Sequence, residues 1–590
     1  MEGSTFTSMR AEVIGNFGVV SATHGIPAQV AMGVLERGGN AFDAAVAAGL
    51  VFHIVDPDMA GFGGELVALV KRADEAEPMV LCAQGTAPAH ATIAHYQAEG
   101  FDLIPGVGVM AAVVPGAFDG WMLLLRDYGT MDLATIFEAS LNYAAGGFPL
   151  TANAAKHLRR YVSNMRQWRA TAETYLLEGG PPTPGQIIIN RPLANCLNRI
   201  VTEATARGTG REQQIETARE IYYGGFVAET IDTFIRGYRE PDSSSDRLHQ
   251  GLLTADDMAH WRASFERPLW YDYDGARVFK PHAWAQGAVL LQTLAILGDL
   301  RLDGADMLNA DAVHLQAEAL KLAFADREAW YGDPKFIDVP MRHLLSDEYN
   351  TLRRSEIAPT AALDLRPGNV PGRQPVLPRY DTGEVGTAVE PAAAVSHEKD
   401  TCHLNIIDRW RNVVSATPSG GWVQDSPLIP DLGFSLSTRG QMFWLQDGLP
   451  SSLAPGRRPR TTLTPTMATL RDGSVLTFGC RGADHSEQGL LQFLLRVLHT
   501  QMDLQTAIET PVFASEHWPS STYPRRAMPG RLLLGRSFGE SVATQLRSRG
   551  HEVQVKPDEA LGRTCVAADR GKLMHAAATG RLGVFVAVGR

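Results

Sequence analysis

The segment DTCHLNIIDRWRNVVSAT, residues 400–417, alternates polar and apolar side chains with a period of two. Successive side chains of a β-strand point to opposite faces, so this alternation is typical of a strand. A predicted turn at 409–411 interrupts it, and a second strand-like run follows from 413 to 417. The segment therefore predicts a β-hairpin in which Thr401 and His403 share one face of the first strand.

The residues before this hairpin have a different character. Residues 355–400 are rich in proline, glycine and alanine and carry little periodic apolar signal. Such composition predicts a loop or a flexible linker, because it offers no continuous face for a core. A linker would therefore end directly before Thr401.

Elsewhere the sequence mixes helical and strand patterns. Apolar residues at helical spacing predict two helices within residues 33–50, separated by a turn at Gly38, Gly39 and Asn40. Paired glycines predict a turn over residues 56–65, before a strand at 66–71. The remaining predicted elements are helices at 121–147, 311–329 and 540–549, the last capped by Gly550, and a strand at 552–555. The sequence thus predicts mixed α and β layers.

Composition excludes several classes of protein. The chain of 590 residues carries 54 basic and 65 acidic side chains, and the resulting net charge of −11 argues against nucleic acid as a partner. No basic stretch followed by a long apolar run opens the chain, and the apolar residues 44–55 are too few to span a bilayer. We therefore expect a cytoplasmic protein that does not span a membrane.

The five cysteines are few, odd in number and scattered, with no CxxC pair that would indicate a redox or zinc motif. We expect most of them to be buried structural thiols. Cys402 alone requires a closer look, because it follows Thr401.

Five motifs resemble the γ-glutamyltransferase family in their order and spacing. They are GGNAFDAAVA at 38–47, DPDMAGFGGE at 56–65, VPGAFDGW at 114–121, EALKLAFADREAWYGDP at 318–334 and DTCHLNIID at 400–408. The similarity extends from Gly18 to the C-terminus. It implies an α+β fold, a four-layer αββα sandwich of the N-terminal nucleophile hydrolase type. It also implies self-cleavage between Asp400 and Thr401, giving a large subunit 1–400 and a small subunit 401–590 that stay intertwined as one unit.

The resemblance implies that Thr401 is the nucleophile. The family begins its small subunit with Thr-Thr-His, and this chain reads Thr401, Cys402, His403. Cleavage would free the α-amino group of Thr401, whose reference pKa of about 7.7–8.0 suits a general base near neutral pH. His403 is more simply explained as a structural hydrogen-bonding residue than as the base.

The same resemblance implies further site residues. Ser419 matches a hydroxyl residue that hydrogen-bonds the nucleophile and assists processing. Gly482 and Ala483 match the loop whose backbone N–H groups form the oxyanion hole, although alanine restricts φ. Thr461 and Thr462 match two serines that bind the substrate α-carboxylate.

Two departures from the family bear on the substrate. The arginine that grips the γ-glutamyl α-carboxylate falls at Gln84, which lacks the charged bidentate fork. The acidic residue for the α-amino group falls near Met442, and Arg439 introduces a positive charge in the same segment. We therefore expect Arg439 to hold a substrate carboxylate, with Arg460 and Arg481 as the next candidates.

These residues predict acyl transfer from a small amide through an ester on Thr401, without metal or organic cofactor. One alternative is an acylase or amidohydrolase of the same family that acts on a non-glutamyl amide, such as a dicarboxylic acid monoamide. Another is an unprocessed, inactive relative that acts as a binding protein.

Overall fold

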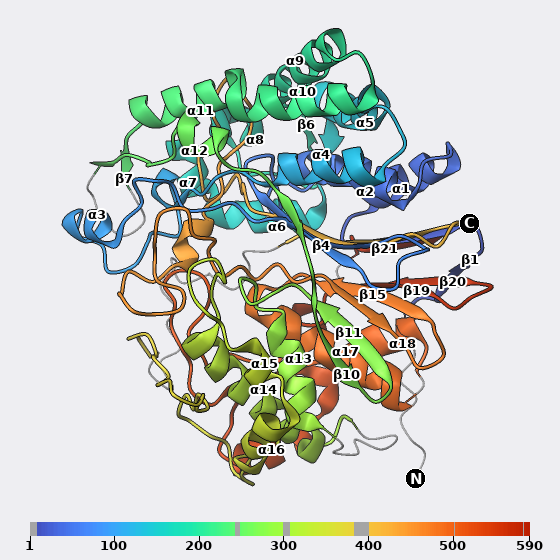
Figure 1. Ribbon diagram of the computed structural model, residues 1–590, viewed down its shortest axis with the longest axis vertical. Helices are drawn as coiled ribbons and strands as arrows, with labels where there is room; N and C mark the ends of the chain where they lie inside the picture. Colours follow the sequence, from blue (N-terminus) through green and yellow to red (C-terminus); the bar gives the residue numbers. More distant parts are fainter. Residues whose placement is uncertain (1–8, 242–247, 299–306, 383–400, 501, 582) are drawn as a thin grey trace.

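The computed structural model describes residues 9–241, 248–298, 307–382, 401–500, 502–581 and 583–590. Two seven-stranded sheets are stacked in the middle of the molecule, and helices cover the outer face of each (Figure 1). This arrangement confirms the predicted α+β, four-layer αββα sandwich.

The first sheet contains the predicted hairpin at its centre. Its order is β21 (Val586–Gly589), β2 (Gly18–Ala22), β12 (Leu404–Asp408), β13 (Val413–Ser419), β3 (Glu65–Lys71), β4 (Met79–Ala83) and β9 (Ser264–Glu266). The second sheet has the order β1 (Val13–Gly15), β20 (Met574–Ala578), β19 (Thr564–Asp569), β15 (Val475–Cys480), β14 (Thr466–Thr469), β11 (Ala276–Lys280) and β10 (Leu269–Tyr273). Both sheets combine strands from before residue 400 with strands from after it.

The outer layers consist mainly of long helices. Those over the first sheet are α1 (Gly25–Glu36), α2 (Ala41–Val55), α4 (Ala117–Tyr128), α5 (Leu133–Gly146), α9 (Arg191–Arg207), α10 (Arg211–Gly224) and α11 (Phe226–Gly237). Those over the second sheet are α13 (Ala288–Leu297), α14 (Ala310–Trp330), α17 (Ser486–Thr500) and α18 (Leu504–Glu509).

Shorter elements complete the fold. The short helices are α3 (Ile93–Ala98), α6 (Ala152–Leu158), α7 (Val162–Gln167), α8 (Arg169–Tyr175), α12 (Ala255–Ala259), α15 (Met341–Leu344), α16 (Asp347–Ser355) and α19 (Glu540–Ser548). A three-stranded sheet contains β16 (Phe513–Ser515), β17 (Arg531–Gly535) and β18 (Glu552–Lys556). Two short pairs join β5 (Phe148–Pro149) to β6 (Ile187–Ile188) and β7 (Glu240–Pro241) to β8 (Leu248–His249).

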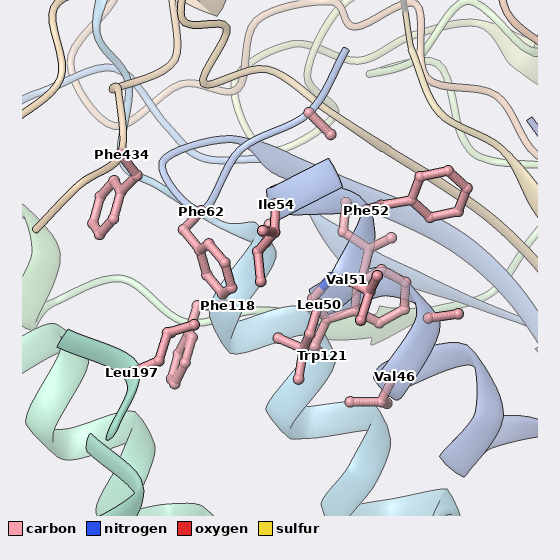
Figure 2. Close-up of a cluster of buried hydrophobic side chains, with 14 of the residues drawn as sticks. Val46, Leu50, Val51, Phe52, Ile54, Phe62, Phe118, Trp121, Leu197 and Phe434 are labelled. Atoms are coloured by element: carbon pink, nitrogen blue, oxygen red, sulfur yellow. The ribbon is translucent and has the colours of Figure 1, made fainter. Parts of the chain in front are cut away.

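Three apolar clusters hold the layers together. The largest lies between the first sheet and its helices, and Figure 2 shows part of it, with Leu50 of α2 and Trp121 of α4 among the labelled side chains. A second fills the space between the other sheet and its helices. The third, which includes Val67, Phe279 and Ile407, lies between the two sheets. Burial on both faces explains why β4 and the interior positions of β3 are apolar.

The predicted hairpin is confirmed. β12 and β13 pair antiparallel, with Leu404 opposite Ala416 and Ile407 opposite Val413. The second strand extends two residues beyond the predicted end, to Ser419. Because β2 and β3 flank the pair on its two outer sides, the hairpin lies in the interior of the sheet.

The other predicted elements are also confirmed, with one refinement. The predicted helix–turn–helix corresponds to α1 and α2, and Asn40 caps α2 by accepting hydrogen bonds from Phe42 N and Asp43 N, each at 2.9 Å. The helical region at 121–147 consists of two helices, α4 and α5, because Gly129 and Asp132 end one and begin the other. All five cysteines are buried free thiols, and no helix in the described ranges is long and apolar enough to cross a membrane.

Part of the predicted linker is described. Residues 356–382 contain no named helix or strand, but hydrogen bonds hold them on the surface of the second helical layer. Ala361 N donates to Arg549 O at 2.7 Å, and Gly368 N donates to Asp326 Oδ1 at 2.6 Å. These residues are therefore anchored rather than loose. The rest of the predicted linker, residues 383–400 with Asp400, lies outside the described residues.

Replacing Gly49 with alanine tests the packing of α2 on α4. A Cβ at this position would lie 2.2 Å from Trp121 Cζ2, well inside contact distance. Overpacking of this kind costs about 1–3 kcal/mol, so Gly49→Ala should lower the midpoint of thermal unfolding measured by calorimetry. Gly33→Ala, in α1, is the matched control, because its Cβ would meet nothing within 4 Å. It should stabilise by about 0.4–1 kcal/mol. An unchanged midpoint for Gly49→Ala would contradict this packing.

Candidate active site

Thr401 lies beside the end of β13. It forms an isolated antiparallel bridge with Ser419, and the next residue, Cys402, donates its N–H to Pro418 O at 3.0 Å. The Thr401 Oγ1 atom lies 3.2 Å from Ser419 Oγ. The structure thus brings together the predicted nucleophile and the hydroxyl residue predicted to assist it, and both are buried.

His403 is held by hydrogen bonds within the sheet. Its Nδ1 lies 2.9 Å from Thr417 Oγ1, and its Nε2 lies 3.0 Å from Asn405 Oδ1. Burial lowers the pKa of His403 to about 4, so the imidazole is neutral near pH 7. A Cβ at Gly479, on β15 of the other sheet, would lie 2.0 Å from the imidazole. The contacts of His403 therefore join the two sheets next to Thr401, as expected for a structural residue.

Cys402 points to a different environment from Thr401. Its Sγ lies 3.4 Å from Asp56 Oδ2 in the buried turn after α2. Burial, reinforced by the negative charge of Asp56, raises the pKa of the Cys402 thiol well above its usual value. The thiolate is the reactive form of cysteine, so this environment disfavours thiol chemistry.

Arg439 lies against Ser419 in the interior. It begins the short helix η5 (Arg439–Met442), and its Nη2 donates to Ser419 Oγ at 2.6 Å. Its Nη1 lies 3.4 Å from Thr462 Oγ1, and its Nε lies 3.3 Å from Glu65 Oε2. The side chain is only 2% exposed. Arg439 is therefore not a solvated arginine on the protein surface.

Glu65 was not singled out by the sequence, although it ends the DPDMAGFGGE motif. It is fully buried at the start of β3, where it forms an ion pair with Arg439. Burial raises the pKa of Glu65 to about 7, although the charge of Arg439 acts in the opposite direction. A carboxyl group that changes its ionisation near neutral pH is thus connected to Thr401 through the side chains of Arg439 and Ser419.

Close packing of backbone explains the glycines of this motif. A Cβ at Gly64 would lie 2.2 Å from Ser419 O, and one at Gly63 would lie 2.1 Å from Ser435 O. Across the contact, Gly420 has φ +78°. Only residues without a side chain allow these segments to meet, so the motif positions Ser419 by letting the two backbones touch.

The loop predicted to form the oxyanion hole follows β15. Gly482 has φ +146°, and Ala483 has φ +46°, a left-handed conformation that costs a non-glycine residue about 1–3 kcal/mol. Surrounding contacts hold it there. Ala483 O accepts a hydrogen bond from Gln286 Nε2 at 2.9 Å, and the next residue, Asp484, pairs with Arg327. Alanine was expected to restrict φ at position 483. The backbone there nevertheless adopts the left-handed conformation, and the surrounding contacts hold it in place.

Arg327 explains the motif on α14. Its guanidinium is fully buried and pairs with Glu328 at 2.7 Å and with Asp484, while Ser521 N–H also binds Asp484 at 2.7 Å. Sequence reasoning found this motif only through the family resemblance. Its geometric role, which is to fix the loop after Gly482, depends on a contact 157 residues away in the chain.

The two predicted hydroxyl ligands differ in their surroundings. Thr462 Oγ1 accepts a hydrogen bond from Arg439, so it belongs to the cluster around Ser419. Thr461 Oγ1 instead accepts from Leu463 N at 3.3 Å, which closes a local turn. The structure therefore connects Thr462 to the predicted nucleophile through side chains, and uses the Thr461 hydroxyl in its own backbone.

Gln84 and Met442 are the residues that the sequence predicts in place of the charged ligands of a glutamyl head group. Gln84 follows β4, is 1% exposed and donates from Nε2 to Gly85 O at 3.2 Å. Its Oε1 has no hydrogen-bond partner among the described residues. Met442 places its sulfur 3.9 Å from Arg439 Nη1.

The two alternative arginines have different positions. Arg460 is buried, and it pairs with Glu328 at 2.6 Å and donates to Arg327 O at 3.1 Å. It therefore belongs to the framework that holds α14. Arg481 directly precedes Gly482 and lines two cavities beside the loop.

One cluster has the composition of a metal site. His314, Glu318 and His551 place ligand atoms within 4.8 Å of one another. Lys321 Nζ binds the Glu318 carboxylate at 2.7 Å, and His314 Nδ1 and His551 Nε2 lie 2.8 Å apart, within hydrogen-bond distance. A lysine on the single carboxylate opposes a cation. These contacts explain the cluster as a hydrogen-bonded link between α14 and residues near β18.

Comparison with known proteins gives matches over nearly the whole chain. The protein LmbA2991HD, of known structure, is 43% identical, and the match covers 99% of this chain and 100% of that one with a TM-score of 0.92. The cephalosporin acylase of Bacillus halodurans is 26% identical, covers 100% and 99% of the two chains, and has a TM-score of 0.82. The oxamate amidohydrolase proenzyme of Klebsiella pneumoniae is 28% identical over 94% of this chain and 95% of its own length.

The resemblance seen in the motifs is therefore confirmed. The fold is that of the N-terminal nucleophile hydrolases, and two of the relatives are named as an acylase and an amidohydrolase. The family model described as gamma-glutamyltranspeptidase matches residues 27–584. Because that match spans nearly the whole chain, the protein is an enzyme that belongs to the γ-glutamyltranspeptidase family.

Proposed function

We propose that the protein is a self-processing threonine hydrolase that cleaves a non-glutamyl amide through an ester on Thr401. The observation that carries this proposal is the 3.2 Å contact between Thr401 Oγ1 and Ser419 Oγ, with Arg439 behind the serine. The match to a family of proenzymes supports it, as does the order of the chain, in which Thr401 follows the predicted cleavage position.

In the proposed processing step, Thr401 Oγ1 attacks the carbonyl carbon of Asp400. The C–N bond between the two residues breaks, the nitrogen takes up a proton, and an ester joins Asp400 to the Thr401 oxygen. Water then hydrolyses this ester, which leaves a carboxylate on Asp400 and a free α-amino group on Thr401. The product is a large subunit 1–400 paired with a small subunit 401–590.

In turnover, the α-amino group of Thr401 takes the hydroxyl proton as Oγ1 attacks the substrate amide. The N–H groups of Gly482 and Ala483 would stabilise the oxyanion. The amine leaves with the proton, and water or another amine resolves the ester. When water resolves the ester, the chemistry needs only groups of this chain and the solvent.

Arg439 is better suited to supporting Ser419 than to binding substrate. Since a guanidinium only donates, Ser419 Oγ must accept from it, which favours donation of the serine hydrogen toward Thr401 Oγ1. That donation would stabilise negative charge as it develops on the nucleophile. Glu65 balances the buried charge and fixes the orientation of the guanidinium. We therefore assign Arg439 a positioning role in place of the carboxylate-binding role expected from the sequence.

The surroundings of Gln84 support a non-glutamyl acyl group. A buried amide cannot replace the charged fork that binds an α-carboxylate, and its unpartnered Oε1 would favour a donor on the substrate. Two relatives carry the names of an acylase and an oxamate amidohydrolase. The rival reading as a γ-glutamyl enzyme requires robust turnover of γ-glutamyl amides, and the reading as a binding protein requires chains that stay intact.

Purified protein should be cut between Asp400 and Thr401. The fragments should be roughly 43 and 21 kDa by proportion of the 64.0 kDa chain, and N-terminal sequencing of the smaller one should begin at Thr401. Thr401→Ala should stay whole because the attacking hydroxyl is gone, while Thr401→Ser should be cut. Cys402→Ala is the control and should be cut normally. A fragment that begins at residue 402, or cleavage of Thr401→Ala, would contradict the assignment of Thr401 as the nucleophile.

The rate of self-cleavage should depend on Glu65. Since the pKa of Glu65 is about 7, the carboxylate that orients Arg439 is present above that pH and lost below it. Wild-type cleavage should therefore slow as the pH falls through 7, before any α-amino group of Thr401 exists to titrate. Glu65→Gln should be slower by about tenfold at pH 8, as expected for one charge-assisted hydrogen bond, and should lack this pH dependence.

This dependence can be measured on freshly translated precursor, by following the cut fraction over time from pH 6 to 8.5. Glu138→Gln is the matched control, because Glu138 is exposed and pairs with Arg37 on the surface. It should behave like wild type. A pH profile unchanged in Glu65→Gln would remove Glu65 from the mechanism.

Hydrolysis of γ-glutamyl anilide should be weak. Loss of the two charged contacts to the head group removes about 1.5–3 kcal/mol apiece, or roughly one to two decades of kcat/KM for each. The measurement compares γ-glutamyl anilide with simple acyl anilides on the processed enzyme. Turnover of the γ-glutamyl compound at the higher rate would favour the rival reading.

A further inference from the structure

Gln286 lies between two loops that the family resemblance assigns to the substrate. It precedes α13 and is only 1% exposed. Its backbone N–H donates to Thr461 O at 2.9 Å, and Thr461 N–H donates to Trp284 O at 3.0 Å. Its side chain reaches the other loop, where Nε2 donates to Ala483 O at 2.9 Å. One residue thus joins the predicted substrate-binding loop to the predicted oxyanion loop.

The partners of the Gln286 side chain determine the orientation of its amide. Oε1 accepts a hydrogen bond from Arg327 Nη1 at 2.8 Å. A guanidinium only donates and a backbone carbonyl only accepts, so the amide oxygen must face Arg327 and the nitrogen must face Ala483 O. Arg327 is itself held by ion pairs with Glu328 and Asp484. The amide therefore takes one orientation only, and a carboxylate in its place could not donate to Ala483 O.

The carbonyl that Gln286 holds belongs to a residue in a strained conformation. Ala483 has φ +46°, in the left-handed region that glycine adopts freely and alanine does not. The torsion φ relates the N–H of Ala483 to its Cα, so a return to negative φ would turn this N–H relative to the carbonyl. The direction of one predicted oxyanion donor therefore depends on contacts that keep Ala483 in this conformation.

Two other hydrogen bonds of this loop are local. Ser486 N–H also donates to Ala483 O, and His485 N–H donates to Gly482 O at 2.8 Å. Both bonds join residues of the same turn, so they would move with it. The Gln286 side chain instead ties Ala483 to a segment 197 positions away in the chain. It therefore fixes the turn relative to the predicted substrate-binding loop.

We propose that Gln286 is a positioning residue, which holds Ala483 in the left-handed conformation and sets the oxyanion loop at a fixed distance from Thr461 and Thr462. The inference rests on the proposed function, because it concerns an N–H group proposed to stabilise the oxyanion. Such a donor lowers the barrier only when it is placed correctly before the reaction. Loss of the Gln286 contact should therefore lower kcat and leave KM nearly unchanged.

Gln286→Glu tests the proposal with almost no change in side-chain volume. The carboxylate keeps its contact with Arg327 but repels Ala483 O. After the cut fraction has been measured, kcat of the processed enzyme for its best acyl anilide should be lower by about tenfold to hundredfold, somewhat less than for complete loss of an oxyanion donor. If this variant fails to fold, Gln286→Met, which has a similar volume and no charge, serves the same comparison.

Gln492→Glu is the matched control. Gln492 on α17 is 2% exposed, its Nε2 donates to Phe513 O at 2.9 Å, and its Oε1 accepts from Phe513 N at 3.1 Å. The substitution thus places a carboxylate against a buried backbone carbonyl away from the two loops. It should lower the midpoint of thermal unfolding, as Gln286→Glu does, but keep the kcat of wild type.

A double-mutant cycle with Ala483→Gly distinguishes positioning from a merely structural role. Glycine adopts positive φ without strain, so Ala483→Gly should restore part of the kcat that Gln286→Glu loses. The two substitutions should therefore be coupled rather than additive. Additive effects on kcat, or an equal fall of kcat in Gln286→Glu and Gln492→Glu, would overturn the proposal.

Hydrogen exchange followed by mass spectrometry adds a measurement that needs no activity. Residues 482–486 should exchange faster in Gln286→Glu than in wild type, because the turn that protects His485 N–H loses its distant anchor. Gln492→Glu should leave this segment unchanged. Exchange equal to wild type in Gln286→Glu would contradict the anchoring. Faster exchange in a chain without amidase activity would refute the proposed function and still support the anchoring by Gln286.

Discussion

The antiparallel pairing of β12 with β13 is the constraint on which the rest of the site depends. It places Thr401 opposite Ser419, and a shift by one residue would turn Thr401 to the other face of the sheet. Flanking strands β2 and β3 prevent such a shift, because each is paired in its own register. The position of one hydroxyl is therefore determined by four strands, of which two come from the early part of the chain.

Around this hairpin, the protein keeps charges inside that most proteins leave on the surface. Arg439 and Arg327 are buried arginines, and each is matched by a carboxylate from a distant segment. Breaking either pair would leave an uncompensated charge in the interior, which is costly. One pair lies behind Ser419 and the other behind the loop after Gly482. Buried ion pairs thus hold both the hydroxyl group beside the predicted nucleophile and the loop predicted to form the oxyanion hole.

The sequence predicted the elements well and the contacts poorly, for a physical reason. Hydrophobic periodicity is local, so it located the hairpin, α2 and α14 within a few residues, although α1 begins at Gly25, before the predicted region. The pairing of Glu65 with Arg439 joins residues 374 positions apart, and no periodic pattern records it. For that reason the sequence assigned Arg439 to substrate, whereas its surroundings connect it to Ser419. The residues found through the family resemblance, Ser419 and Thr462, are those that the structure brings together.

The presence of early and late strands in both sheets has a consequence for the stability of the cleaved molecule. Among the described strands, five pairings join residues on opposite sides of position 400: β2 with β12, β2 with β21, β3 with β13, β1 with β20 and β11 with β14. A cut before Thr401 would leave two chains that cannot separate without dissolving both sheets. Refolding would then require two molecules to meet, so recovery after unfolding would depend on concentration. Cleavage would therefore make unfolding difficult to reverse. The chain would fold once as a single polypeptide, and the cleaved protein would be lost if it later unfolded.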